Sequence, residues 1–122
     1  MNSHLEHKSQ EIAHALIRIA AYIRKPELKK RIDSYSYDLI AAIAANNSAT
    51  SVNTANVLKA FVILGRNTLL IEPNNARILM RELDGFIKSC SCLLRLAEVD
   101  IASPQTDLIT RLLVGVQRER LL

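Results

Sequence analysis

Three histidines and one glutamate near the start of this 122-residue chain have a spacing that could hold a metal ion. His4, His7, Glu11 and His14 would fall within about 80° of arc on a helix that turns about 100° per residue. Glu11 and His14 have the Glu-x-x-His spacing of di-iron sites in helical bundles, but those sites need the motif twice, together with further carboxylates. Here it occurs once and lies opposite the apolar residues of its own segment. We interpret it as a solvated helix face and predict neither a metal nor another cofactor.

Other motifs that would indicate catalysis are missing from the sequence. Helical-bundle nucleases often use an arginine followed a few residues later by a histidine, but all three histidines precede the first arginine, Arg18. There is no glycine-rich phosphate loop, nucleophile elbow or pair of catalytic carboxylates. Cys90 and Cys92 are two residues apart and point in different directions on a helix, so they cannot form an ordinary disulfide or jointly hold a metal. We expect a protein that is not an enzyme, with Cys90 in the core and Cys92 more exposed.

The strongest chemical feature is positive charge arranged along one predicted helix. Lysine and arginine outnumber aspartate and glutamate by 16 to 12, which gives a net charge of +4 and a pI of about 9.3. Four cations would lie within about 40° of one another, opposite the apolar side, with Asp84 interrupting the row. These four, here called the basic stripe, are Arg77, Arg81, Lys88 and Arg95. A second basic run consists of Lys29, Lys30 and Arg31. Such charge favours the phosphates of nucleic acids, and an ordinary solvated face is the alternative.

Composition predicts an all-α fold. Hydrophobic residues make up 49% of the chain, glycine and proline number three each, and aromatic residues are 4%, which argues against a sheet and against disorder. The longest uncharged run, residues 39–58, has a polar centre at 46–51, so it cannot be a membrane span. The first residues are unlike a signal peptide. We expect a cytoplasmic protein with no membrane partner.

Apolar spacing predicts the elements that position these residues. Helices are expected at residues 5–24, 26–45, from Ser51 or Asn53 as the N-cap to 70, and at 74–97, with a loop at 46–51. Ser103 and Pro104 indicate the start of a further, less stable helix. The predicted architecture is therefore an antiparallel four-helix bundle at residues 1–102 with an additional C-terminal helix at 103–122.

The third predicted helix is apolar nearly all round. Its core stripe is expected to be Leu58, Val62 and Leu69. Val57, Phe61 and Leu64 lie to one side of that stripe, so a lone bundle would leave them on the surface. We therefore predict that Val57, Phe61 and Leu64 form the interface of a homo-oligomer.

The segments 28–32, 39–46, 55–61 and 79–88 carry a family resemblance in their apolar spacing and in the placement of the loops between them. About half of the chain, residues 28–89, resembles a family of small four-helix-bundle proteins. That family contains the accessory variability protein of diversity-generating retroelements and the proteins encoded in intervening sequences of large-subunit ribosomal RNA genes. The resemblance implies a non-catalytic accessory protein of mutagenic retrohoming. It also implies a basic, pentameric ring that binds a reverse transcriptase and its template RNA or other nucleic acid.

A second hypothesis needs no nucleic acid. The apolar surface of the third helix and of the C-terminal segment would also suit a helical protein–protein scaffold or adaptor of a soluble bacterial or phage complex. A reverse transcriptase gene beside this one would favour the first hypothesis.

Overall fold

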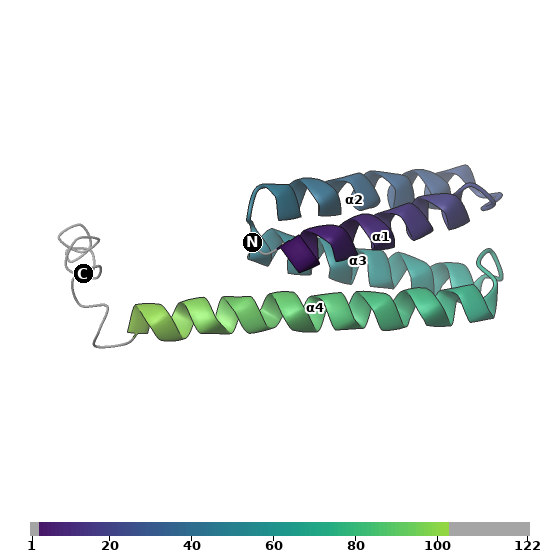
Figure 1. The fold of residues 1–122 in the computed structure, drawn as a ribbon. Helices are drawn as coiled ribbons and strands as arrows, with labels where there is room; N and C mark the ends of the chain where they lie inside the picture. Colours follow the sequence, from purple (N-terminus) through teal and green to yellow (C-terminus); the bar gives the residue numbers. More distant parts are fainter. Residues whose placement is uncertain (1–2, 103–122) are drawn as a thin grey trace. The chain divides into compact units, whose positions relative to one another are not determined.

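The computed structural model describes residues 3–102, and the side chains as far as Leu96. These residues form four α-helices and no strand, which confirms the all-α class: α1 (Ser3–Ala20), α2 (Pro26–Ala44), α3 (Ser48–Asn67) and α4 (Pro73–Ala102) (Figure 1). The chain divides into two units, Met1–Ser91 and Cys92–Leu122, and α4 runs from the first into the second. The predicted C-terminal helix at 103–122 lies outside the described residues. Among the described helices, none has the length and apolarity needed to cross a membrane.

The first unit buries one face of each helix. Its core includes Leu5, Ile12, Leu16, Leu28, Ile32, Leu39, Ile43, Leu58, Val62, Leu79, Leu83 and Phe86. Each of these side chains contributes roughly 1.5–3 kcal/mol by leaving water. Tyr35 is half-buried and stacks on Phe61 of α3, with ring centroids 5.8 Å apart. Ser36 takes the buried position, because its hydroxyl can donate to the carbonyl oxygen of Ile32 at 2.6 Å within its own helix.

The first helix ends earlier than the predicted residue 24. After Ala20 the backbone tightens, with Tyr22 N–H donating to Ile19 O and Ile23 N–H to Ala20 O. This turn brings Ile23 back into the core, where it is buried. Pro26 then begins α2, as expected from its fixed φ and missing N–H.

The third helix begins earlier than predicted. Asn47 is its N-cap, and the Asn47 side chain accepts a hydrogen bond from the Thr50 N–H at 3.0 Å. Ser51, predicted as a possible cap, is buried within the helix and donates its hydroxyl to Asn47 O at 2.8 Å. The predicted loop at 46–51 is therefore shorter than expected: Asn46 and Asn47 lie between the helices, whereas residues 48–51 form the first turn of α3, a position that polar side chains favour.

The end of α3 has an uncommon backbone conformation. Leu69 has a φ of 62°, in the left-handed region that glycine or asparagine usually occupies after a helix. The Leu70 and Ile71 N–H groups donate to Gly65 O at 2.8 and 3.0 Å, which closes the helix end. Because the chain leaves the helix here, Leu69 is 79% exposed and does not continue the core stripe of Leu58 and Val62, contrary to prediction.

The fourth helix follows this turn and begins at Pro73. The Glu72 carboxylate accepts the Asn75 N–H at 2.9 Å, which caps the helix. Leu79, Leu83 and Cys90 are buried on one face of the helix. The helix extends to Ala102, beyond the predicted residue 97, since neither glycine nor proline occurs between Ala97 and Pro104.

Candidate nucleic-acid interface

The first three members of the basic stripe lie on the exposed side of α4. Arg77, Arg81 and Lys88 are all exposed, and their positions on a helix place them within roughly 40° of one another. Arg77 donates through Nη2 to the Asn74 Oδ1 at 2.6 Å, a neutral partner that leaves its charge uncompensated. Among the described residues, no carboxylate forms an ion pair with any of the three. The row therefore keeps its positive charge.

The carboxylates of α4 explain why that charge is not cancelled. Within residues 73–91, α4 carries Glu82 and Asp84. Asp84, which interrupts the stripe in sequence, pairs with Lys59 of α3 at 2.6 Å. Glu82 pairs with Lys8 of α1 at 3.0 Å. Both carboxylates are engaged by lysines of other helices rather than by the stripe.

Arg95, the fourth member of the predicted stripe, belongs to the second unit. Its side chain is exposed there. The interface described from here on consists of the three stripe residues of the first unit.

The second basic run is partly neutralised within α2. Lys29 pairs with Asp33 at 2.9 Å, and Arg31 donates through Nε to Glu27 at 3.0 Å. The hydrogen bond to Glu27 also raises the pKa of Arg31 above its usual range. Lys30 is exposed and has no ion-pair partner among the described residues. Of this run, Lys30 alone offers an unpaired charge.

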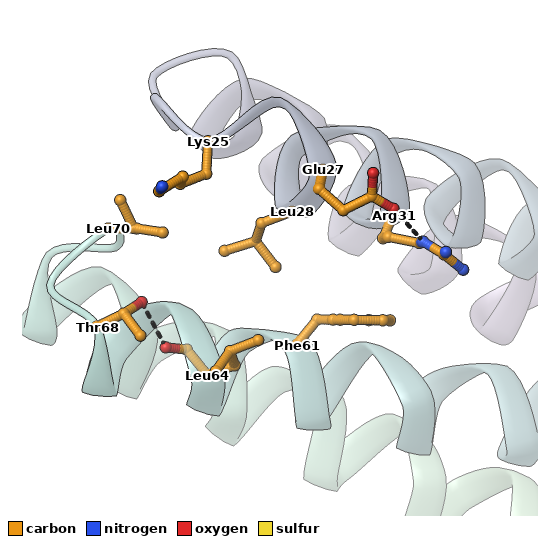
Figure 2. Close-up of a pocket in the computed structure, with 8 residues that line it drawn as sticks. All are labelled: Lys25, Glu27, Leu28, Arg31, Phe61, Leu64, Thr68 and Leu70. Carbon is orange, nitrogen blue, oxygen red and sulfur yellow. Dashed lines mark hydrogen bonds and ion pairs between the residues drawn. The ribbon is translucent and has the colours of Figure 1, made fainter.

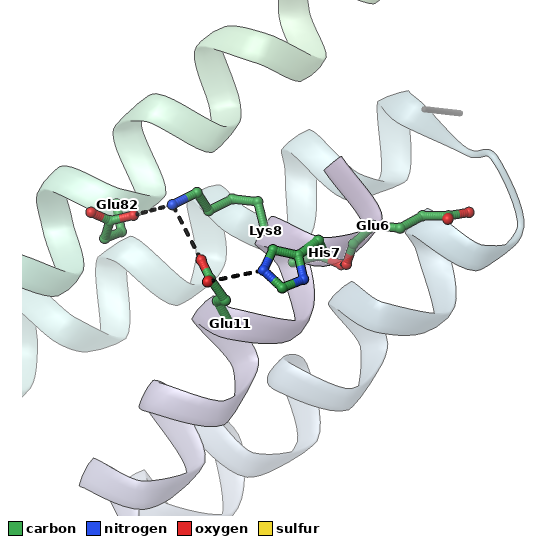
Figure 3. Close-up of polar contacts among 6 residues, drawn as sticks. Glu6, His7, Lys8, Glu11 and Glu82 are labelled. Atoms are coloured by element: carbon green, nitrogen blue, oxygen red, sulfur yellow. Dashed lines mark hydrogen bonds and ion pairs between the residues drawn. The ribbon is translucent and has the colours of Figure 1, made fainter. Parts of the chain in front are cut away.

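His7 and Glu11 of the α1 cluster belong to a polar network. His7 Nε2 lies 3.1 Å from a Glu11 oxygen, and Lys8 Nζ lies between Glu82 and Glu11, at 3.0 and 3.4 Å (Figure 3). The hydrogen bond to Glu82 raises the pKa of Lys8, and the hydrogen bond from Lys8 lowers the pKa of Glu11. His4 and His14 are exposed. No group of three or more potential ligands within the described part of the chain is placed to hold a metal ion.

The two cysteines lie as predicted. Cys90 is fully buried and Cys92 is exposed. Burial raises the pKa of the Cys90 thiol to about 11. This thiol is therefore a small core residue without nucleophilic character near neutral pH.

The predicted oligomer interface lies beside a groove that the sequence did not indicate. Val57 and Phe61 are half-buried, and Leu64 is 49% exposed. Phe61 and Leu64 form one wall of a groove of about 520 Å³, whose other residues are Lys25, Glu27, Leu28, Arg31, Thr68 and Leu70 (Figure 2). Nothing in the sequence indicates that Lys25 and Leu70 line the same groove, because Lys25 precedes α2, Leu70 follows α3, and the two meet only when these helices pack together.

Comparison with known proteins identifies no relative. No protein-family model, curated protein sequence or solved structure matches this chain. The resemblance to the retroelement accessory family therefore stays a prediction, and function has to be inferred from the geometry described above.

Proposed function

We propose that this protein is a non-catalytic accessory protein that binds nucleic acid through the basic stripe of α4. The ion pair between Asp84 and Lys59 carries the proposal, since it neutralises the one negative charge within the row. Arg77, Arg81 and Lys88 then face solvent as a row of positive charges without carboxylate partners among the described residues. Phosphates are attracted to such a surface without regard to base sequence.

The length of the row favours a polymeric anion. At about 1.5 Å per residue, the Cα atoms of Arg77 and Lys88 are about 16 Å apart along the axis of α4. A single phosphate group cannot contact both ends of such a row. A nucleic-acid strand can, because it presents a phosphate at every nucleotide, with about one charge per 3.4 Å along each strand of a duplex.

The resemblance adds the biological setting of this proposal. In that setting the helices form an antiparallel four-helix bundle in the cytoplasm, and several copies assemble into a ring, a pentamer in the family. The ring binds a reverse transcriptase and its template RNA during mutagenic retrohoming. Repeating the stripe around a ring would raise affinity for a long nucleic acid through multivalency, without any new contact.

The stripe can be tested by removing its charge without changing the helix. Glutamine has nearly the helix propensity of arginine and lysine, so we expect an Arg77→Gln, Arg81→Gln, Lys88→Gln triple variant to keep its helicity. Its affinity for structured RNA or duplex DNA should fall at least about tenfold, roughly 1.4 kcal/mol. The slope of log K against log salt should become shallower by about 2.7 for duplex DNA, if each cation contacts one phosphate. Filter binding at several salt concentrations measures both quantities.

A matched control distinguishes the effect of the stripe residues on affinity from the effect of the overall net charge. Arg18, Arg24 and Arg66 are also exposed and lie outside α4. Their triple glutamine variant has the same net charge as the stripe variant and should retain most of the affinity. Equal losses in the two variants would show that binding depends on overall charge alone, and no loss in either would refute the nucleic-acid proposal.

The adaptor function remains the second candidate, and the groove beside Leu64 is the observation that favours it.

A further inference from the structure

The groove between α2 and α3 has apolar walls contributed by both helices. Leu28 points from the first turns of α2 toward α3, and Phe61 and Leu64 point back from the last turns of α3 (Figure 2). Leu70 closes one end, next to Lys25 (Figure 2). The volume of about 520 Å³ falls within the range of about 300–1,000 Å³ usual for ligand sites. The groove is therefore large enough to hold apolar side chains of another molecule.

Two exposed leucines belong to the groove and to the turn that follows α3. Leu64 is 49% exposed, and Leu69, which lies between the lining residues Thr68 and Leu70, is 79% exposed. Leu69 is also held in the left-handed backbone region, which costs a residue with a side chain roughly 1–2 kcal/mol. A bulky apolar residue at a strained and exposed position is a recurrent feature of contact sites. An occupant that covers both exposed leucines would have to be larger than a small ligand, which favours a macromolecule.

The rim of the groove is positively charged. Arg31 is already paired with Glu27, but the ammonium group of Lys25 has no carboxylate partner among the described residues. Arg24, exposed just before Lys25, adds to the positive potential. An occupant with carboxylates would complement this rim, whereas a basic one would be repelled.

We propose that this groove binds an acidic amphipathic helix of a partner protein. The apolar side of that helix packs on Leu28, Phe61 and Leu64, and one of its carboxylates pairs with Lys25. Helices that place apolar anchors in a groove between two other helices are a common mode of peptide recognition. The site lies on α2 and α3, so it leaves the basic stripe of α4 free for nucleic acid.

Charge argues against two arrangements in which this chain itself would fill the groove. Residues 103–122 contain Arg111, Arg118 and Arg120 against two carboxylates, so this segment is basic like the rim. A second copy related by a two-fold axis through the groove would bring Lys25 against the basic rim of its partner. Both arrangements place like charges together.

Fluorescence anisotropy of a labelled peptide tests the proposal with the full chain. The probe is a helical peptide of about four turns, with leucines on one face and glutamates elsewhere, compared with versions that carry glutamine or lysine in place of glutamate. We expect the glutamate peptide to bind with micromolar affinity and Leu64→Asp to weaken it at least about tenfold. Lys25→Glu should weaken it about fivefold and instead favour the lysine peptide.

Matched variants make the result specific. Ile78→Asp changes another partly exposed apolar residue, on α4, and Lys30→Glu reverses a charge that does not line the groove. Both should bind the glutamate peptide nearly as well as the parent, as should the triple glutamine variant of the stripe. Thermal melts of all variants confirm that each is folded.

Three results would overturn the proposal. The first is equal binding of the glutamate and glutamine peptides. The second is equal weakening by Leu64→Asp and Ile78→Asp. The third is an oligomer that Leu64→Asp converts to monomers while no peptide binds, because the groove would then be an interface between copies of this chain.

Discussion

Replacing each of two helical glycines by alanine should change stability in opposite directions. Gly85 lies in α4 with nothing within 4 Å of the position of an added Cβ. Alanine there should stabilise the protein by about 0.5–1 kcal/mol, through its higher helix propensity alone. Gly65 lies in α3, and a Cβ added to it would be 2.5 Å from Ile71 Cδ1 and 2.7 Å from Ile71 Cγ1.

The contact with Ile71 should make alanine at position 65 destabilising, in contrast to alanine at position 85. Forcing a methyl group into such a space costs roughly 1–3 kcal/mol, which exceeds the gain in helix propensity. We therefore expect Gly65→Ala to destabilise the protein by about 1 kcal/mol. The effect matters for the proposed binding site, because Gly65 and Ile71 hold the turn that supplies Thr68 and Leu70 to the groove.

Urea denaturation followed by far-UV circular dichroism measures these changes, and a double variant isolates their cause. Ile71→Ala removes Cγ1 and Cδ1, and the remaining Cβ would be 3.4 Å from the new methyl group, an ordinary contact. In that background Gly65→Ala should no longer destabilise the protein. The reasoning is refuted if Gly65→Ala costs as much in the Ile71→Ala background as in the parent, or if Gly65→Ala and Gly85→Ala shift the midpoint in the same direction.

Three further predictions concern helix ends and the buried thiol. Leu69→Gly should stabilise the fold by about 0.5–1 kcal/mol by relieving the left-handed strain, and a loss of stability in urea melts would contradict this. The same variant should bind the acidic peptide more weakly. Asn47→Ala should lower the free energy of unfolding by about 1 kcal/mol by removing the cap of α3, whereas Asn47→Ser should keep most of this stability. Equal melting behaviour of the two variants would exclude capping as the cause. Burial raises the pKa of Cys90 to about 11 from an ordinary value of 9.0, so above pH 9 the unfolded chain releases this proton while the folded chain keeps it. Stability should therefore fall between pH 9 and about 11, less steeply in a Cys90→Ala variant, and identical alkaline slopes in the two proteins would refute this contribution.

Local features of the sequence were enough to predict the helices and most of their buried faces. The spacing of Leu79, Leu83 and Cys90 predicts a helix with one apolar side, because helical periodicity relates residues only a few positions apart. Pro26 marks the start of α2 for a similar reason, since its effect is confined to its own backbone. The exposure of the stripe residues Arg77, Arg81 and Lys88 also follows from this periodicity.

Errors at helix ends came from signals that suit two structures equally well. The polar run at 46–51 is typical of a loop and equally of a capped first turn, and the hydrogen bond from Thr50 to Asn47 decides between them. At the other end of α3, apolar spacing would continue through Leu69. The helix ends there because Ile71 packs on Gly65 and because the Leu70 and Ile71 N–H groups both donate to the Gly65 carbonyl oxygen.

What the tertiary structure alone decided is which distant residues meet. Asp84 neutralises Lys59 rather than a member of the stripe, and Glu82 pairs with Lys8, across sequence separations that no local pattern records. The groove likewise joins Lys25 to Leu70, which are far apart along the chain. Charge and apolar spacing are properties of a segment and can be read from it, whereas ion pairing and concavity are properties of two surfaces and exist only once helices pack.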